Sequence, residues 1–228
     1  MYKFKVKAVI FDMDGVITNT MPAHFRAWKK IFKREGLNAT KCEIYLREGQ
    51  PGNITIKEIF REHGLPFDVR KTKPILAEKE KLFKKIVRTR FIPGARSLLH
   101  FLKNRGFQLA LVTGTSRHEV RRILPKHVFN LFSVTVTGDE VKRGKPHPEP
   151  YLVALKKLNM KPREVVVIEN APFGIRSAKR AHLTCLALET SLPGRQADLP
   201  KTYLKDADFV FSSFKNLRVS VAFVRGLT

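Results

Sequence analysis

Two aspartates follow an apolar run in this 228-residue sequence, in the stretch VIFDMDGV at residues 9–16. The β-branched and aromatic residues before Asp12 predict a buried β-strand. Side chains two residues apart in an extended segment face the same way, so Asp12 and Asp14 lie on one side of the chain. Neighbouring carboxylates repel each other unless a proton or a cation intervenes, and oxygen ligands suit Mg²⁺. The pair indicates a Mg²⁺ site where one carboxylate attacks and the other handles the leaving group.

Three further predicted strand ends carry polar residues. In VTGTS, Thr113 offers a hydroxyl and Gly114 lets the backbone approach an anion closely. In GKPHPEPY, Lys145 is a cation fixed just before a helix, where it could balance acids and a phosphate. Glu169 and Asn170 end the run EVVVIEN. Each is also compatible with a structural role (helix capping, a surface lysine or a polar turn), but their order along four strand ends favours one shared site.

The pattern of apolar residues predicts the elements that position these side chains. A first strand is expected at residues 5–12, and strands and helices alternate after residue 92. Near-continuous apolar strands in such an alternation indicate a parallel sheet covered by helices on both faces. Residues 20–90 instead repeat apolar residues at three- and four-residue spacing between Gly and Pro breaks, which predicts amphipathic helices and no strand.

We therefore expect an α/β fold with a Rossmann-like parallel sheet. The catalytic core would comprise residues 1–18 and 93–228, and a small helical domain at residues 19–92 would be inserted after the first strand.

The charge is strongly basic, with 44 Lys and Arg against 20 Asp and Glu, a net charge of +24. Nucleic-acid binding is one interpretation of such a surplus. The basic residues are scattered at helix-like spacing without a recognition motif, which disfavours it, and such a surface would also attract small anionic substrates. Cys42 and Cys185 lie far apart without metal-ligand spacing, and no apolar run suits a signal peptide or a membrane span. We expect a reduced, cytoplasmic protein; the sequence does not indicate an oligomeric state.

The ordered set of motifs resembles the haloacid dehalogenase superfamily of aspartyl phosphotransferases (HAD). DMDGV matches the first motif of that superfamily, VTGTS the second, Lys145 the third and IENAPFG the fourth, from residue 9 to about residue 182. The helical insert resembles its small cap domain. Within the superfamily, the sequence is most similar to the β-phosphoglucomutase-like phosphatase group, and DGVITNTMPAHFRAWK, with His24 and Trp28, is especially similar to the mutases.

This resemblance implies a set of residue roles. Asp12 would attack phosphorus and become an aspartyl-phosphate, while Asp14 would protonate the leaving oxygen and then deprotonate water. Thr113 and the Gly114 amide would bind phosphate oxygens, and Lys145 would hold Asp12 and the phosphate. Mg²⁺ would lie between the Asp12 carboxylate, the Asp14 carbonyl and the fourth motif, Glu169 and Asn170. Dehalogenases lack an acid at the position of Asp14, so phosphoryl transfer is favoured over dehalogenation.

Two departures from the family pattern bear on function. Asn170 stands where the fourth motif usually has Asp, so this position contributes no charge to a metal site. Gly52 stands where β-phosphoglucomutases have an arginine that grips the distal phosphate of a bisphosphate intermediate, and Arg47 is nearby but not aligned. The second departure favours a phosphatase over a mutase.

We therefore expect a Mg²⁺-dependent phosphatase of a small phosphorylated metabolite, such as a sugar phosphate. The alternatives are a β-phosphoglucomutase and a basic nucleic-acid-binding protein on the same fold. His24 would either help to gate Asp14 or simply belong to the polar face of the first inserted helix. Trp28, one turn later, would pack within the insert.

Overall fold

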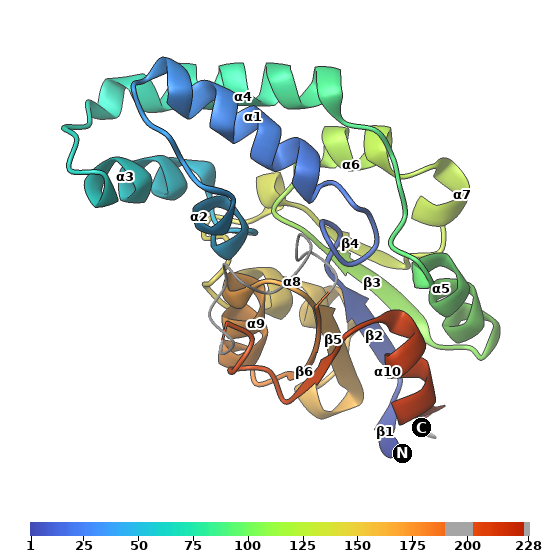
Figure 1. The fold of residues 1–228 in the computed structure, drawn as a ribbon. Coiled ribbons are helices and arrows are strands. Elements are labelled where there is room, and N and C mark those ends of the chain that lie inside the picture. Colours follow the sequence, from blue (N-terminus) through green and yellow to red (C-terminus); the bar gives the residue numbers. More distant parts are fainter. Residues whose placement is uncertain (190–202, 226–228) are drawn as a thin grey trace.

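A six-stranded parallel sheet lies at the centre of the computed structural model, which describes residues 1–189 and 203–225 (Figure 1). Its strands lie in the order β4-β3-β2-β5-β6-β7, and every neighbouring pair is parallel. The predicted parallel α/β fold is therefore confirmed. Residues 190–202 and 226–228 of the predicted core lie outside the described residues. The strands are β2 (Ala8–Phe11), β3 (Gln108–Val112), β4 (Val134–Val136), β5 (Val165–Glu169), β6 (Thr184–Leu188) and β7 (Phe209–Phe211).

The prediction of one first strand at residues 5–12 is wrong, because the chain forms two strands there. β1 (Tyr2–Val6) pairs in parallel with β8 (Val221–Arg225) in a separate two-stranded sheet, whereas β2 enters the centre of the main sheet. Lys7 marks the break: its N–H donates to the Glu164 carbonyl at 2.7 Å. The sequence pattern did not reveal β8, and without this distant partner β1 could not be told from an extension of β2.

Helices cover both faces of the main sheet, as the alternation of side chains in its central strand requires. Val9 and Phe11 of β2 join one buried cluster, and Ala8 and Ile10 join the other. The first cluster is closed by α5 (Ala95–Asn104), α6 (Arg117–Ile123), α7 (Lys126–Phe129) and α10 (Phe214–Ser220); the second is closed by α8 (Glu149–Leu158) and α9 (Pro172–Arg180). Three short 3₁₀ turns complete the described elements: η1 (Val69–Lys71), η2 (Gly138–Glu140) and η3 (Pro162–Glu164).

The segment between β2 and α5 is helical, as predicted, and lies above the carboxyl edge of the main sheet (Figure 1). We call its four α-helices the helical layer: α1 (Met21–Arg34), α2 (Lys41–Leu46), α3 (Gly52–Glu62) and α4 (Thr72–Ile86). Trp28, Phe32, Ile56 and Ile59 belong to a buried cluster of the layer's own. The short helix α2 was not predicted, although Thr40 and Glu43 form a capping box at its start. That residues 19–92 form a separate domain stays a prediction.

The strand register brings the polar residues together. Phe11 of β2 lies opposite Leu111 of β3 and Ile168 of β5, so Asp12 and Glu169 leave neighbouring strands at the same level. Parallel strands end at a common edge, which is why residues more than 150 positions apart in the sequence meet there. No helix in residues 1–189 and 203–225 is long and apolar enough to span a membrane.

Candidate active site

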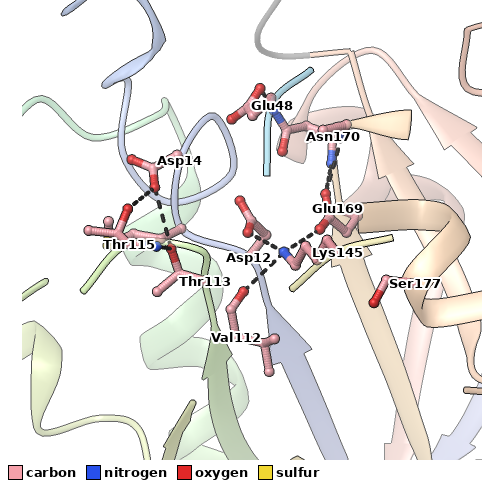
Figure 2. A network of polar contacts seen from close by, with 12 residues as sticks. Asp12, Asp14, Glu48, Val112, Thr113, Thr115, Lys145, Glu169, Asn170 and Ser177 are labelled. Carbon is pink, nitrogen blue, oxygen red and sulfur yellow. Dashed lines mark hydrogen bonds and ion pairs between the residues drawn. The ribbon is translucent and has the colours of Figure 1, made fainter. Parts of the chain in front are cut away.

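Lys145 is the centre of the polar network at the carboxyl edge of the sheet (Figure 2). Its ammonium donates to Asp12 Oδ1 at 2.6 Å, to Glu169 Oε1 at 2.7 Å and to the Val112 carbonyl at 3.2 Å. The side chain is only 2% exposed. A lysine with all three N–H groups engaged on acceptors from three strands is held in one position, so it is not the ordinary surface lysine considered from the sequence.

Glu169 is fixed as firmly as the lysine that it contacts. Its Oε1 also accepts from the Tyr151 hydroxyl at 2.9 Å, and its Oε2 accepts from the N–H groups of Asn170 and Ala171 at 2.8 and 3.2 Å. Four protein donors therefore converge on the two oxygens, counting Lys145. In this geometry the carboxylate orients Lys145; that Glu169 ligates a metal stays a prediction.

Asp12 and a second buried acid, Glu169, both accept hydrogen bonds from Lys145. Burial of Asp12 raises its pKa and Lys145 lowers it, but with the nearby charges of Glu169 and Asp14 the pKa reaches about 8. The single ammonium of Lys145 does not neutralise the acids around it. Within the described part of the chain, no hydrogen bond reaches Asp12 Oδ2. The protein thus leaves one carboxylate oxygen of Asp12 available for chemistry.

Asp14 is turned away from Lys145 and toward a group of hydroxyls (Figure 2). Thr115 donates to its Oδ2 at 2.9 Å, Thr113 lies 3.4 Å from the same oxygen, and Thr20 donates to Oδ1. Burial raises the pKa of Asp14, but contacts with His24, Thr20 and Thr115 outweigh burial and lower the pKa to about 2. The two aspartates therefore have opposite pKa shifts, because one is surrounded by other acids and the other by hydroxyl donors.

His24 and Lys79 extend this group into the helical layer. His24 Nε2 lies 3.7 Å from Asp14 Oδ1, which is an electrostatic contact rather than a full hydrogen bond. Lys79 of α4 lies 3.1 Å from His24 Nδ1, and because an ammonium has no lone pair, Nδ1 must be the acceptor. His24 then carries its proton on Nε2, toward Asp14. Burial lowers the pKa of His24 and the charge of Lys79 lowers it further, which favours the neutral ring.

His24 therefore lies beside Asp14, as the functional interpretation of the sequence required, and its ring also stacks on Phe83 with 3.9 Å between centroids. Lys79 was not identified from the sequence, since in a chain with 44 basic residues one lysine carries no signal. Trp28 packs on Phe32 and under Lys79, which agrees with the packing role expected for it.

The second motif lies beside Asp14, but its hydroxyl is engaged. Thr113 Oγ1 accepts from the Thr115 N–H at 3.1 Å and faces Asp14, whereas Gly114 is exposed. Gly138 makes room for this loop, because a Cβ at residue 138 would lie 2.1 Å from the Gly114 carbonyl oxygen. Phosphate binding by Thr113 and Gly114 stays a prediction.

The loop between α2 and α3 inserts a residue that the sequence did not reveal. Glu48 is 9% exposed, and its Oε2 accepts from Asn170 Nδ2 at 3.0 Å. Next to it, Gly49 lies against Lys145 and Gly114: a Cβ at residue 49 would lie 3.3 Å from Lys145 Cδ, and one at residue 114 would lie 3.5 Å from the Gly49 carbonyl. This loop thus contacts Asn170, Lys145 and Gly114 at the strand ends.

Arg47 does not reach the site. It is bonded to Glu58 at 3.2 Å and to Glu62 within the helical layer, and its side chain is 10% exposed. Gly52 packs beneath Leu76 and Trp28, where a Cβ would lie 2.5 Å from Leu76 Cδ2. Neither residue places a cation beside Asp12 or Asp14.

The donor chemistry of the site fits a hard divalent cation. Asp12, Asp14, Glu169 and Asn170 offer only oxygen ligands, and their carboxylates outnumber the single Lys145. In residues 1–189 and 203–225, no three His, Cys, Asp or Glu side chains are arranged as a ready metal site. The free Asp12 oxygen and the Asp14 main chain are the groups that such a cation would use without disturbing Lys145.

Comparisons with known proteins are consistent with this geometry. The family model described as haloacid dehalogenase-like hydrolase matches residues 9–188. A phosphorylated carbohydrates phosphatase of Thermotoga maritima is 36% identical over 183 residues, which cover 77% of this chain and 82% of the relative. The β-phosphoglucomutase of Bacillus subtilis is 31% identical over 209 residues, covering 85% and 88%. A solved structure from Bacteroides vulgatus, provisionally assigned as a β-phosphoglucomutase, superposes with a TM-score of 0.81 at 34% identity, covering 96% and 88%.

Proposed function

Because this chain belongs to the haloacid dehalogenase-like hydrolase family, we propose that it is a Mg²⁺-dependent phosphatase of a small phosphorylated sugar or polyol. The observation that carries the proposal is the contact of Lys145 with Asp12 and Glu169 at 2.6 and 2.7 Å. Asp14 lies beside this group and accepts a separate hydrogen bond from the Thr115 hydroxyl. The Thermotoga relative named for phosphorylated carbohydrates supports the substrate class.

In the first step, an oxygen of Asp12 attacks phosphorus and the bond from phosphorus to the alcohol oxygen breaks. The leaving oxygen takes a proton from Asp14. In the free site Asp14 is ionised, since its pKa is about 2. An incoming phosphate dianion raises that pKa, because a like charge disfavours the ionised form, and Asp14 takes up a proton from solvent as the substrate binds. Lys145 holds Asp12 at the attack position and offsets the charge that gathers on the phosphoryl oxygens.

In the second step, water attacks the aspartyl-phosphate and the bond between phosphorus and the Asp12 oxygen breaks. Asp14, now ionised again, accepts the proton of that water. Asp12 is restored and inorganic phosphate leaves. His24 keeps its Nε2 proton toward Asp14 in both steps and so holds the carboxylate in place.

Mg²⁺ would be held by the Asp12 carboxylate, the Asp14 main-chain carbonyl and the residues of the fourth motif, Glu169 and Asn170. Its chemistry there would be to neutralise phosphoryl oxygens and to lower the pKa of Asp12, which burial has raised to about 8.

The helical layer would act as a cap that excludes water until the acyl phosphate has formed. Its contacts through Glu48 and Gly49 to the strand ends support this role.

A β-phosphoglucomutase is the second candidate, since one of the relatives carries that name. A mutase must retain a bisphosphate intermediate and needs a cation for its distal phosphate. Arg47 forms ion pairs with Glu58 and Glu62, and Gly52 has no side chain, so neither residue supplies a cation that would bind the distal phosphate.

The test is phosphate release from a panel of sugar and polyol monophosphates, with and without Mg²⁺, beside Asp12→Asn. Release that requires both Mg²⁺ and Asp12 is expected. Conversion of β-glucose 1-phosphate into glucose 6-phosphate without phosphate release would instead identify the mutase.

A further inference from the structure

Glu48 is a buried acid that the proposed mechanism does not use. It comes from the loop after α2 in the helical layer, yet it lies beside the catalytic carboxylates at the strand ends (Figure 2). Its Oε2 is bonded to Asn170, whereas its Oε1 is fully buried and has no hydrogen-bond partner in the described ranges. A buried polar atom without a partner costs free energy, so its persistence points to a partner that binds later.

The surroundings of Glu48 restrict what that partner can be. The charges of Asp12, Asp14 and Glu169 lie near it, and together with burial they raise its pKa well above the ordinary value. A second phosphate or a carboxylate on the ligand would be repelled by this group of acids. A hydroxyl suits the position best, because it can donate to an ionised carboxylate or accept from a protonated one.

We propose that Glu48 determines substrate specificity by hydrogen bonding, through Oε1, to a hydroxyl of the alcohol part of a phosphorylated substrate. This inference rests on the proposed function and assigns the polyhydroxylated leaving group to one residue. It also predicts a preference against bisphosphates, because Glu48 and the nearby acids would repel a second phosphate.

Asn170 makes this arrangement possible. Its amide donates to Glu48 at 3.0 Å, whereas an aspartate at residue 170 would place a second carboxylate against Glu48. The neutral Asn170 and the acidic Glu48 are therefore complementary. The variant Asn170→Asp should melt at a lower temperature than the wild type without added metal, and Glu48→Gln in that background should restore most of the loss.

The main experiment compares two substrates that share a phosphate but differ in hydroxyls. One is the best sugar or polyol monophosphate of the panel, and the other is p-nitrophenyl phosphate, whose leaving group has no hydroxyl. Glu48→Ala should lower kcat/KM for the hydroxylated substrate by about 30-fold or more, as expected for losing a hydrogen bond to a charged group. It should change kcat/KM for p-nitrophenyl phosphate less than threefold. Glu78→Ala, an exposed acid of the same layer, is the matched control and should change neither.

Glu48→Gln is a second variant that keeps the shape and one acceptor oxygen, so it should lose less activity on the hydroxylated substrate than Glu48→Ala. It should also improve the relative rate with a sugar bisphosphate, since one repelling charge is removed. Melting temperatures of both variants establish that they fold.

Three results would overturn the inference: equal losses with both substrates, no loss with either, or a tenfold weaker binding of Mg²⁺ to Glu48→Ala by calorimetry. The first and third would assign Glu48 to the phosphate or the metal. If the wild type releases no phosphate from any substrate, the proposed function fails instead. Binding of the hydroxylated monophosphate to Asp12→Asn, with and without Glu48→Ala, then decides about Glu48 alone: weaker binding without Glu48 supports its role, and equal binding excludes it.

Discussion

Gly174 of α9 leaves the space in which the carboxylate of Glu169 lies. A Cβ at residue 174 would be 1.7 Å from Glu169 Oε1 and 2.1 Å from Cδ. The same Oε1 accepts from Lys145 and Tyr151, so the glycine sets the position of the lysine through the glutamate. A side chain at Gly174, the final glycine of IENAPFG, would thus clash with Glu169, which the sequence alone does not show.

The variant Gly174→Ala should displace Glu169 and with it Lys145. We expect a loss of about 1–3 kcal/mol in the free energy of unfolding, because the added methyl overpacks a buried site. Phosphate release should fall by at least tenfold, since Lys145 no longer holds Asp12. Chemical denaturation and steady-state kinetics measure the two effects. Arg176→Ala on the same helix, with a side chain 42% exposed, should leave both nearly unchanged. Wild-type values for Gly174→Ala would show that the carboxylate relaxes freely.

Removing the charge of Lys79 should raise the pKa of His24. Burial lowers that pKa and Lys79 lowers it further, while Asp14 raises it. Lys79→Met keeps the packing on Trp28 and Phe83 but removes the cation, so the His24 titration should move to higher pH in an NMR experiment. Phosphate release should slow by about tenfold, the equivalent of one lost hydrogen bond in the Asp14 group. Lys81→Met, exposed on the same helix, provides the control. An unmoved titration would mean that Lys79 does not act on the ring.

Replacing Thr115 should raise the pKa of Asp14. The Thr115 hydroxyl donates to Asp14 Oδ2 at 2.9 Å and stabilises the ionised form, which helps to lower the pKa to about 2. In Thr115→Val that bond is lost, so the alkaline limb of the kcat/KM profile, which reports the protonated Asp14 needed in the first step, should move to higher pH. Thr113→Val should move the limb less, because its oxygen lies 3.4 Å away. Equal profiles for wild type and Thr115→Val would contradict this account.

Asp12→Asn should stabilise the metal-free protein, and increasingly so at higher pH. The folded-state pKa of Asp12 is about 8 against an ordinary value of 3.8, so the folded state binds more protons than the unfolded state between these values. Stability of the wild type therefore falls as pH rises from about 4 to about 8, and the variant lacks this loss.

Melting temperatures at a series of pH values would reveal this difference, which should be smallest near pH 4. Added Mg²⁺ should raise the melting temperature of the wild type and reduce the advantage of the variant. A difference that is constant with pH would exclude Asp12 as its source.

The order of motifs in the sequence was enough to predict the parallel sheet, the helical insert and the acids at its carboxyl edge. This worked because apolar strands and strand-end residues obey local rules of periodicity, and parallel strands share one edge. The same rules failed at residues 5–12, where the run KVKAVIFD predicts one strand but is divided between two sheets. That division depends on β8, more than 200 residues away, and no local pattern contains it.

By itself, the sequence determined which residue types stand at the strand ends, and hence the chemistry open to the site. The opposite pKa shifts of Asp12 and Asp14, the anchoring of Lys145 by Glu169, and the entry of Lys79 and Glu48 were decided only by the tertiary structure. The physical reason is that a pKa shift depends on burial and on charges that distant segments bring near, and a lone Glu or Lys in a charged helical segment carries no local signal. The spacing of residues along the chain identifies the candidate site residues, but their protonation and their hydrogen-bond partners depend on how the folded chain packs around them.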